Sequence, residues 1–210
     1  MLVVLNLLAL PLGFLLILYV MMKLGNRKKK KFKPKQKNNW LIAHILSIIV
    51  YFSGLLGTLL MALTTNFTEQ REMIYAAHLF IQYFDWFLII PGGVAAFITG
   101  VWLSVRTHWG VTRYYWIIAK WVGTIGAIFF GANFMRVWLH DNFSEIFSSP
   151  THPLENAFYL SNRLWIYFGL GLSFTILIFL VIISYLKPWG KRVSTQQQPT
   201  EKISQKERVQ

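Results

Sequence analysis

The stretch HLFIQYFDWFLIIPGG, residues 78–93, places one aspartate in the middle of an apolar run. Asp85 is followed by Pro91 and by two glycines, Gly92 and Gly93. Long apolar runs are typical of membrane helices. An ionisable residue in such a helix costs about 2.5–3.5 kcal/mol on insertion scales. The stretch therefore predicts a membrane-spanning helix whose charge faces a partner or a wet cavity.

The composition of the whole chain indicates the same class of protein. Of its 210 residues, 55% are hydrophobic and only 14% are charged, whereas soluble domains are about a quarter charged. The sequence predicts an all-α integral membrane protein with five transmembrane helices, at about 2–24, 40–63, 74–104, 114–139 and 164–186. The chain has no cysteine, which excludes disulfides, thiolate metal sites and cysteine nucleophiles.

The charges alternate between the connections of these helices. Lysine and arginine gather in segments 25–39 and 187–210, whereas the opposite loops, 64–73 and 140–163, carry five acidic residues. The positive-inside rule then predicts the N-terminus outside and the C-terminus in the cytoplasm.

This pattern predicts a simple domain organisation. We expect an N-terminal transmembrane helix at 1–24, a basic cytoplasmic loop at 25–39, a four-helix membrane domain at 40–186 and a disordered cytoplasmic tail at 187–210.

The basic run from Arg27 to Lys37 is a topology determinant in the first place. It could also attract anionic lipid headgroups, at about 1 kcal/mol per basic residue. No folded basic module surrounds it, so nucleic-acid binding is not predicted.

Polar residues follow helical spacing on the third predicted span. His78, Gln82 and Asp85 lie on one edge, because residues three and four apart are neighbours on a helix. Beyond them come Gly92, Ala96 and Gly100, a ladder of small residues that lets another helix approach closely, either within the chain or in a second copy.

Antiparallel neighbours predict which polar residues share a height in the membrane. Reflection about the loop near residue 109 places Asp85 level with Asn133 and Arg136, and His78 level with His140. We therefore expect an intramembrane polar cluster in the outer half of the bundle, with an Asp85–Arg136 ion pair to reduce the insertion cost. The candidates are His78, Gln82, Asp85, Asn133, Arg136 and His140, and His44 on the polar stripe of the second span is a further one.

The third span is too long for a straight crossing. Its 31 residues extend about 46 Å, against a hydrocarbon core of about 30 Å. Pro91 predicts a kink in a tilted helix. The alternative is a broken helix whose backbone groups line a cavity.

Several readings of the polar residues stay open. Asp85 is a structural pair or hydrogen-bonded carboxyl, a carboxylate that couples to protons or ions, or a residue that organises a ligand. His78 and His140 could ligate haem or a metal through neutral imidazole. No metalloprotease, nucleophile-elbow, P-loop or dinucleotide motif is present, so enzymatic activity is not predicted.

A set of short motifs resembles a known family. His44-Ile45-Leu46-Ser47 followed by Gly54 and Gly57, and later Asp85-Trp86 with Pro91 and Thr99-Gly100, are similar to the pattern of a domain-of-unknown-function family (2269) of predicted bacterial integral membrane proteins. The resemblance covers about residues 40–186 and implies a compact four-helix unit in a bacterial cytoplasmic membrane. A looser similarity is to copper-resistance D-type membrane proteins.

Taken with the resemblance, these patterns predict a multi-pass protein of the bacterial inner membrane. Its expected function is that of a small transport or membrane-assembly component with a polar cluster, for which no cofactor is predicted. The alternative is a membrane protein that binds haem b or copper. The bilayer is the expected partner, and an oligomer is left open.

Overall fold

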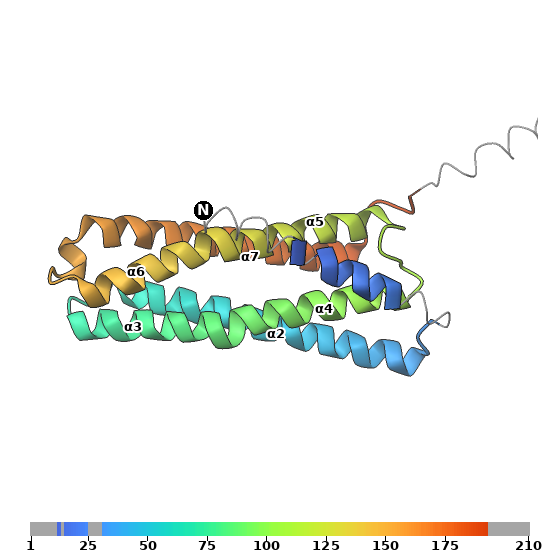
Figure 1. The fold of residues 1–210 in the computed structure, drawn as a ribbon, viewed down its shortest axis with the longest axis horizontal. Helices are drawn as coiled ribbons and strands as arrows, with labels where there is room; N and C mark the ends of the chain where they lie inside the picture. Colours follow the sequence, from blue (N-terminus) through green and yellow to red (C-terminus); the bar gives the residue numbers. More distant parts are fainter. Residues whose placement is uncertain (1–11, 14, 25–30, 193–210) are drawn as a thin grey trace, which may run out of the picture.

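The computed structural model describes residues 12–13, 15–24 and 31–192, and the chain is helical through most of them. Within these residues four helices are long and apolar enough to cross a membrane, namely Pro34–Thr64, Arg71–Arg106, Tyr115–Ser148 and Ala157–Leu186. They lie side by side along one axis (Figure 1). The all-α membrane class is thereby confirmed. About half of the first predicted span, 2–24, falls outside the described residues, and its described part contains a short apolar helix, Leu15–Leu24.

Two of the four long helices contain a π-helical segment, in which the backbone bonds run to the fifth residue instead of the fourth. The elements are α2 (Pro34–Thr64), α3 (Arg71–Phe84), η1 (Asp85–Ile89), α4 (Ile90–Arg106), α5 (Tyr115–Phe130), η2 (Gly131–Met135), α6 (Arg136–Ser148), η3 (Pro153–Glu155) and α7 (Ala157–Leu186). The π segments are η1, between α3 and α4, and η2, between α5 and α6. We call the end where α2 meets α3 the α2–α3 end, and the opposite end the α4–α5 end.

Several helices extend beyond the predicted spans. α2 begins at Pro34, so part of the expected loop 25–39 is helical. Proline suits the first turn because its missing N–H needs no partner there. α7 begins at Ala157 and not at residue 164, because the side-chain oxygen of Asn156 accepts the first free backbone N–H groups of the helix.

The tail after α7 starts on the α4–α5 connection. The backbone N–H of Arg192 donates to the carbonyl of Arg113 at 2.9 Å, and Lys191 forms a bridge with Tyr114. The remainder of the predicted tail, 193–210, lies outside the described residues.

The third predicted span stays helical through Pro91. At the end of η1 the N–H of Ile90 donates to the carbonyl of Asp85, and α4 follows without a break. The backbone is therefore continuous at the place where a broken helix was the alternative. The π-helical turn directly before the proline is the local irregularity, and such turns are one of the known sources of helix bending.

α2 packs on this helix at glycines. A Cβ on Gly92 would lie 2.7 Å from the backbone nitrogen of Tyr51, and one on Gly54 would lie 2.7 Å from Cγ1 and 3.1 Å from the backbone nitrogen of Ile89. At these two glycines the helices lie so close to each other that no side chain fits between them. Gly92, the first residue of the predicted small-residue ladder, therefore packs against another helix of the same chain.

The core lies along the axis of the bundle. Its central cluster joins α2, α3, η2, α6 and α7 through Leu55, Ala62, Ile81, Met135, Leu139, Ile166 and Leu170. Near the α4–α5 end, Phe97 and Val101 of α4 pack with Leu18 and Met22 of the short apolar helix, which lies beside α4 and α5 in Figure 1.

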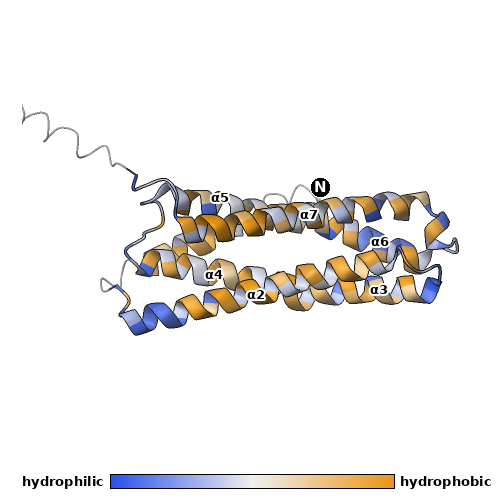
Figure 2. Cartoon of the chain, turned by 180° about the vertical axis from the view of Figure 1, so that it is seen from behind, coloured by the Kyte–Doolittle hydropathy of each residue, from blue (hydrophilic) through white to orange (hydrophobic). Residues whose placement is uncertain are grey.

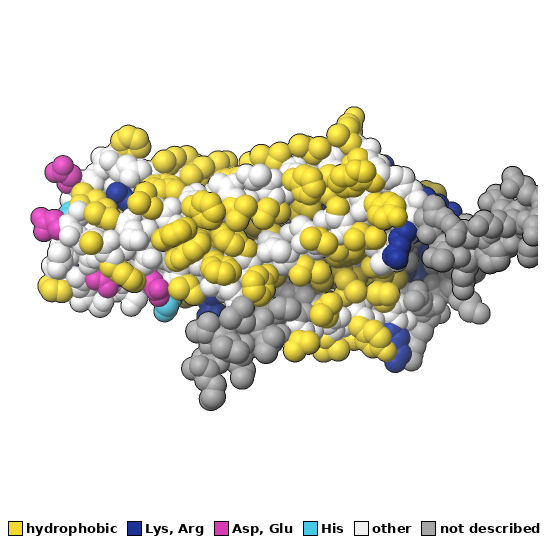
Figure 3. All heavy atoms as spheres, turned by 90° about the horizontal axis from the view of Figure 1, so that it is seen from above, with side chains coloured by type: hydrophobic (Ala, Val, Ile, Leu, Met, Phe, Trp, Pro, Cys, Tyr) yellow, Lys and Arg dark blue, Asp and Glu magenta, His cyan; other side chains and the backbone are white. Residues whose placement is uncertain are grey.

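The outer surface has the polarity of a membrane protein. Many large apolar side chains are exposed along the helices, such as Phe87 at 67% and Leu164 at 68%. Hydrophilic residues concentrate at the helix ends (Figure 2). On the face shown in Figure 3, acidic side chains gather at the α2–α3 end and basic ones mostly at the opposite end.

The glycine contacts predict a stability difference between matched glycine variants. We expect Gly54→Ala and Gly92→Ala each to destabilise the bundle by about 1–3 kcal/mol, because the added methyl meets backbone or packed atoms. Gly126→Ala and Gly171→Ala have nothing within 4 Å of the new methyl and serve as controls that gain only helix propensity. The measurement is thermal unfolding in detergent. Equal midpoints for all four variants would contradict the packing.

Candidate functional site

The two π segments lie at the same level of the bundle. The rings of Tyr75 in α3 and Phe147 in α6 are 5.0 Å apart. These helices are antiparallel, so ten or eleven residues further along each of them Asp85 is level with Arg136. η1 and η2 therefore share a height near the middle of the long helices, and we call the two segments together the π-helical layer. This is the height that reflection about the loop predicts.

Asp85 faces the inside of the bundle. It continues the face of α3 that carries Ile74, His78 and Ile81, all of which are buried. Asp85 itself is half-buried. Among the described residues its carboxylate forms neither a hydrogen bond nor an ion pair, and the Arg136 charge acts on it only through space.

Arg136 shares the height of Asp85 but not its direction. The side chain of Arg136 is exposed, and the preceding residue, Met135, takes the buried position in the core. Successive helical residues point about 100° apart, so with Met135 in the core the Arg136 side chain points toward a different side of the helix. The structure thus brings Asp85 and Arg136 to one level without joining them. Reflection about a loop predicts heights, but it does not predict which face of the helix a residue occupies.

Asn133 serves the π turn in which it lies. Its side-chain amide Nδ2 donates to the carbonyl oxygen of Phe129 at 2.8 Å. A π turn disturbs the regular ladder of backbone bonds, and this side chain satisfies a carbonyl at the start of the disturbance. Gln82 is half-buried on α3, one turn from Asp85 toward the α2–α3 end.

The two histidines proposed as ligands point to different surroundings. His78 is 3% exposed, and its Nε2 lies 3.2 Å from the hydroxyl of Tyr159, with the two rings edge to face. His140 is exposed on α6. The structure does not turn the two imidazoles toward a shared ligand. Nor does any group of three or more histidine, aspartate or glutamate side chains suited to a metal occur in the described part of the chain.

His44 belongs to a different level. Its Nδ1 lies 2.9 Å from Oγ1 of Thr99, and the same hydroxyl donates to the carbonyl of Ala95 at 2.6 Å. Since a hydroxyl has one proton to give, His44 is the donor in the first bond. A Cβ on Gly100 would lie 3.2 Å from Cε1 of His44. The histidine and the Thr-Gly pair therefore form one contact between α2 and α4, toward the α4–α5 end and apart from Asp85.

Sequence reasoning missed the polar residues of α7 and α6. Tyr159, Asn162 and Ser173 are buried on α7, and Asn142 on α6 is fully buried with neither side-chain polar atom hydrogen-bonded. The region was read as loop up to residue 163. Asn156, a favoured N-cap residue, together with the three- and four-residue spacing that follows it, is the signal that could have found this stripe.

Comparison with known proteins identifies one match. The family model described as "Predicted integral membrane protein (DUF2269)" matches residues 40–188, which confirms the resemblance drawn from the short motifs. No curated protein and no solved structure matches the chain significantly. The matched range contains the π-helical layer and the contact between His44 and Thr99.

The His78–Tyr159 bond predicts a specific loss of stability. We expect Tyr159→Phe to destabilise the protein by about 1–3 kcal/mol, because a buried imidazole nitrogen loses its partner. The measurement is thermal unfolding in detergent.

The control for this variant is Tyr185→Phe, whose side chain is 84% exposed and whose change should be near zero. Adding His78→Phe to Tyr159→Phe should recover part of the loss, since the imidazole nitrogen that lost its partner is then removed as well. Additive losses in the double variant would show that the two side chains do not act as a pair.

Proposed function

The chain belongs to DUF2269, a family of predicted integral membrane proteins, and from this premise we propose that it is a small proton-coupled transport component with Asp85 as the proton-binding carboxylate. An ionisable residue inside the bilayer is costly, and such residues in membrane proteins commonly mark a functional site. The observation that carries the proposal is the inward-facing Asp85 carboxylate, which has no bonded partner among the described residues.

The missing partner argues against a purely structural carboxylate. A structural aspartate at this depth needs an ion pair or hydrogen bonds to offset its insertion cost. The two buried histidines of the bundle have such partners, since His44 binds Thr99 and His78 binds Tyr159. Asp85 has none in the described part of the chain. A proton neutralises the carboxylate and removes that cost.

The surroundings favour a proton over a metal cation. Calcium and magnesium take six or more oxygen ligands, whereas a proton needs one acceptor. Asp85 is not part of a cluster of three or more metal-ligating side chains within the described residues. The π-helical layer supports the same choice, because π turns occur frequently at functional sites.

The proposal includes an orientation in the bacterial cytoplasmic membrane. The α4–α5 connection and the start of the tail carry Arg113, Lys187, Lys191 and Arg192, which supports a cytoplasmic position for that end. α2 also starts there, so the basic run 27–37 joins it and can contact anionic lipids.

The orientation predicts opposite labelling of two single-cysteine variants. The chain has no cysteine, so Ser149→Cys at the α2–α3 end and Thr112→Cys at the α4–α5 end are each unique. A membrane-impermeant maleimide applied to intact cells should label Ser149→Cys and leave Thr112→Cys unlabelled until the membrane is opened. The reversed pattern would refute the orientation.

Asp85 predicts a proton-dependent activity. In proteoliposomes with an entrapped pH dye and an imposed potential, we expect the protein to carry protons and Asp85→Asn to fall to the rate of empty liposomes, because asparagine cannot bind and release a proton. Asp141→Asn, on α6 and outside the π-helical layer, is the matched control and should keep the rate. Equal flux in Asp85→Asn and the unaltered protein contradicts the proposal.

Proton binding by Asp85 can also be measured directly, without an assay of transport. Infrared difference spectra between alkaline and acidic buffer should contain a band of a protonated carboxyl that disappears in Asp85→Asn and persists in Asp141→Asn. This measurement separates a carboxylate that never takes up a proton from one that binds protons but carries them across the membrane only when a transported substrate is present.

A further inference from the structure

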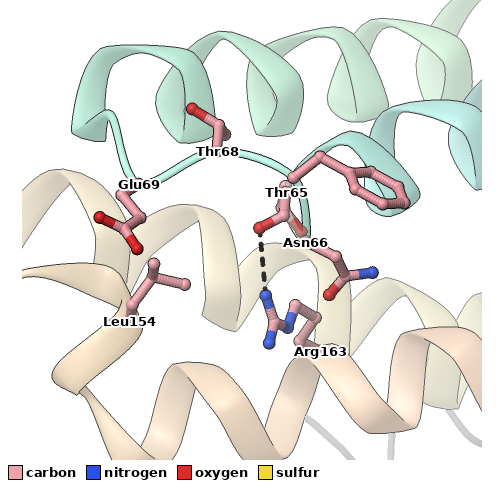
Figure 4. A pocket seen from close by; sticks show the side chains of 7 residues that line it. Thr65, Asn66, Thr68, Glu69, Leu154 and Arg163 are labelled. Carbon is pink, nitrogen blue, oxygen red and sulfur yellow. Dashed lines mark hydrogen bonds between the residues drawn. The ribbon is translucent and has the colours of Figure 1, made fainter.

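A polar pocket opens at the α2–α3 end (Figure 4). It has a volume of about 440 Å³ and is lined by the connection 65–69, by Leu154 next to it and by Arg163 of α7. The lining combines one cation, one anion, two threonine hydroxyls and an asparagine amide. This chemistry suits a small ligand that carries both charges.

Arg163 is held in place by its neighbours. Nη1 donates to the backbone carbonyl of Thr65 at 3.3 Å, as Figure 4 shows, and the guanidinium lies over the ring of Tyr159 at 5.6 Å. Its Nε is buried and forms no hydrogen bond with any residue that the structure describes. Together these contacts fix a positive charge in the wall of the pocket without neutralising it.

Glu69 supplies the opposite charge from the loop. Its backbone carbonyl accepts a hydrogen bond from Nε2 of His152 at 2.9 Å, which ties the loop to the α6–α7 connection. The side chain is exposed. Glu69 and Arg163 line one pocket, yet among the described residues they form no ion pair with each other. A ligand with an anionic and a cationic group can therefore contact both.

The position of the pocket along the bundle indicates the source of such a ligand. α2 has 31 residues and is about 46 Å long, longer than the hydrocarbon core of about 30 Å. The pocket begins directly after its last residue, Thr64, and therefore lies at the level of the lipid headgroups. Phe67 in the wall is 84% exposed, so an apolar ring lies on the surface at this level.

We propose that this pocket binds a phosphoethanolamine group, with its phosphate at Arg163 and its primary ammonium at Glu69. Arginine pairs well with phosphate oxygens, and the ammonium donates hydrogen bonds to a carboxylate. A phosphocholine group has no N–H to donate, and Glu69 repels a headgroup that is only anionic. The site is independent of Asp85 and of proton coupling.

The test is lipid retention by the full-length protein in detergent, measured by native mass spectrometry. The protein is given equal amounts of phosphatidylethanolamine, phosphatidylcholine and phosphatidylglycerol with the same acyl chains. We expect preferential retention of the ethanolamine lipid. Arg163→Gln and Glu69→Gln should each weaken it about tenfold, the usual scale for one charge-assisted hydrogen bond.

Matched variants separate binding from folding. Glu72→Gln, on α3 outside the pocket, and Arg113→Gln, at the α4–α5 end, should retain the lipid like the unaltered protein. Arg163→Lys keeps the charge and should retain more lipid than Arg163→Gln at equal thermal stability. Since the Glu69 side chain is exposed, Glu69→Gln tests the pocket even if the Arg163 variants unfold.

A second arm distinguishes the two sources of the group. Soluble glycerophosphoethanolamine should compete with the lipid only weakly if the bilayer supplies the ligand, and fully if the free headgroup is the ligand. Equal retention of the three lipids, or unchanged retention in Glu69→Gln, overturns the proposal.

Discussion

The structure depends on the backbone contact between α2 and the long helix that contains η1 and α4. At Gly54 and Gly92 the two helices come so close that one added methyl on either glycine meets backbone or packed atoms. In a bilayer, where lipid is as apolar as any side chain, such close packing is a main force between helices. The contact fixes the register of the pair, and this register brings His44 to Thr99.

With the helices in this register, the polar residues lie at three heights along the bundle and make different contacts at each. Toward the α4–α5 end, the hydrogen bond between His44 and Thr99 joins α2 to α4. Toward the α2–α3 end, the hydrogen bond between His78 and Tyr159 joins α3 to α7. Between these two levels lies the π-helical layer. There the Asn133 side chain hydrogen-bonds a backbone carbonyl of its own helix, and Asp85 has no bonded partner within the part of the chain that the structure describes. The inward-facing Asp85 of this layer is the basis for the proposed proton coupling.

The polar features of the α2–α3 end are those of the proposed headgroup pocket. Tyr159 contacts both His78 in the interior and Arg163 of the pocket, so α7 connects the interior of the bundle with the proposed binding pocket. A protein with this arrangement can be held at a defined depth by a bound headgroup while its central layer remains available for a second activity. The two proposed sites use different residues and can be tested separately.

The sequence by itself determined the class of protein, four of its helices and the height of Asp85, because apolar length and helical period are local properties and antiparallel neighbours share a loop. It also predicted the family from a few short motifs. Only the tertiary structure decided which way Arg136 faces, that His44 belongs to a separate contact, and that the helix passes Pro91 through a π turn. These outcomes depend on helix rotation and on packing against distant segments, and neither is encoded in the spacing of residues along one helix. The N-cap at Asn156 belongs to both groups. Its signal is local in the sequence, but the burial of the polar stripe on α7 depends on the packing of α7 against α3 and α6.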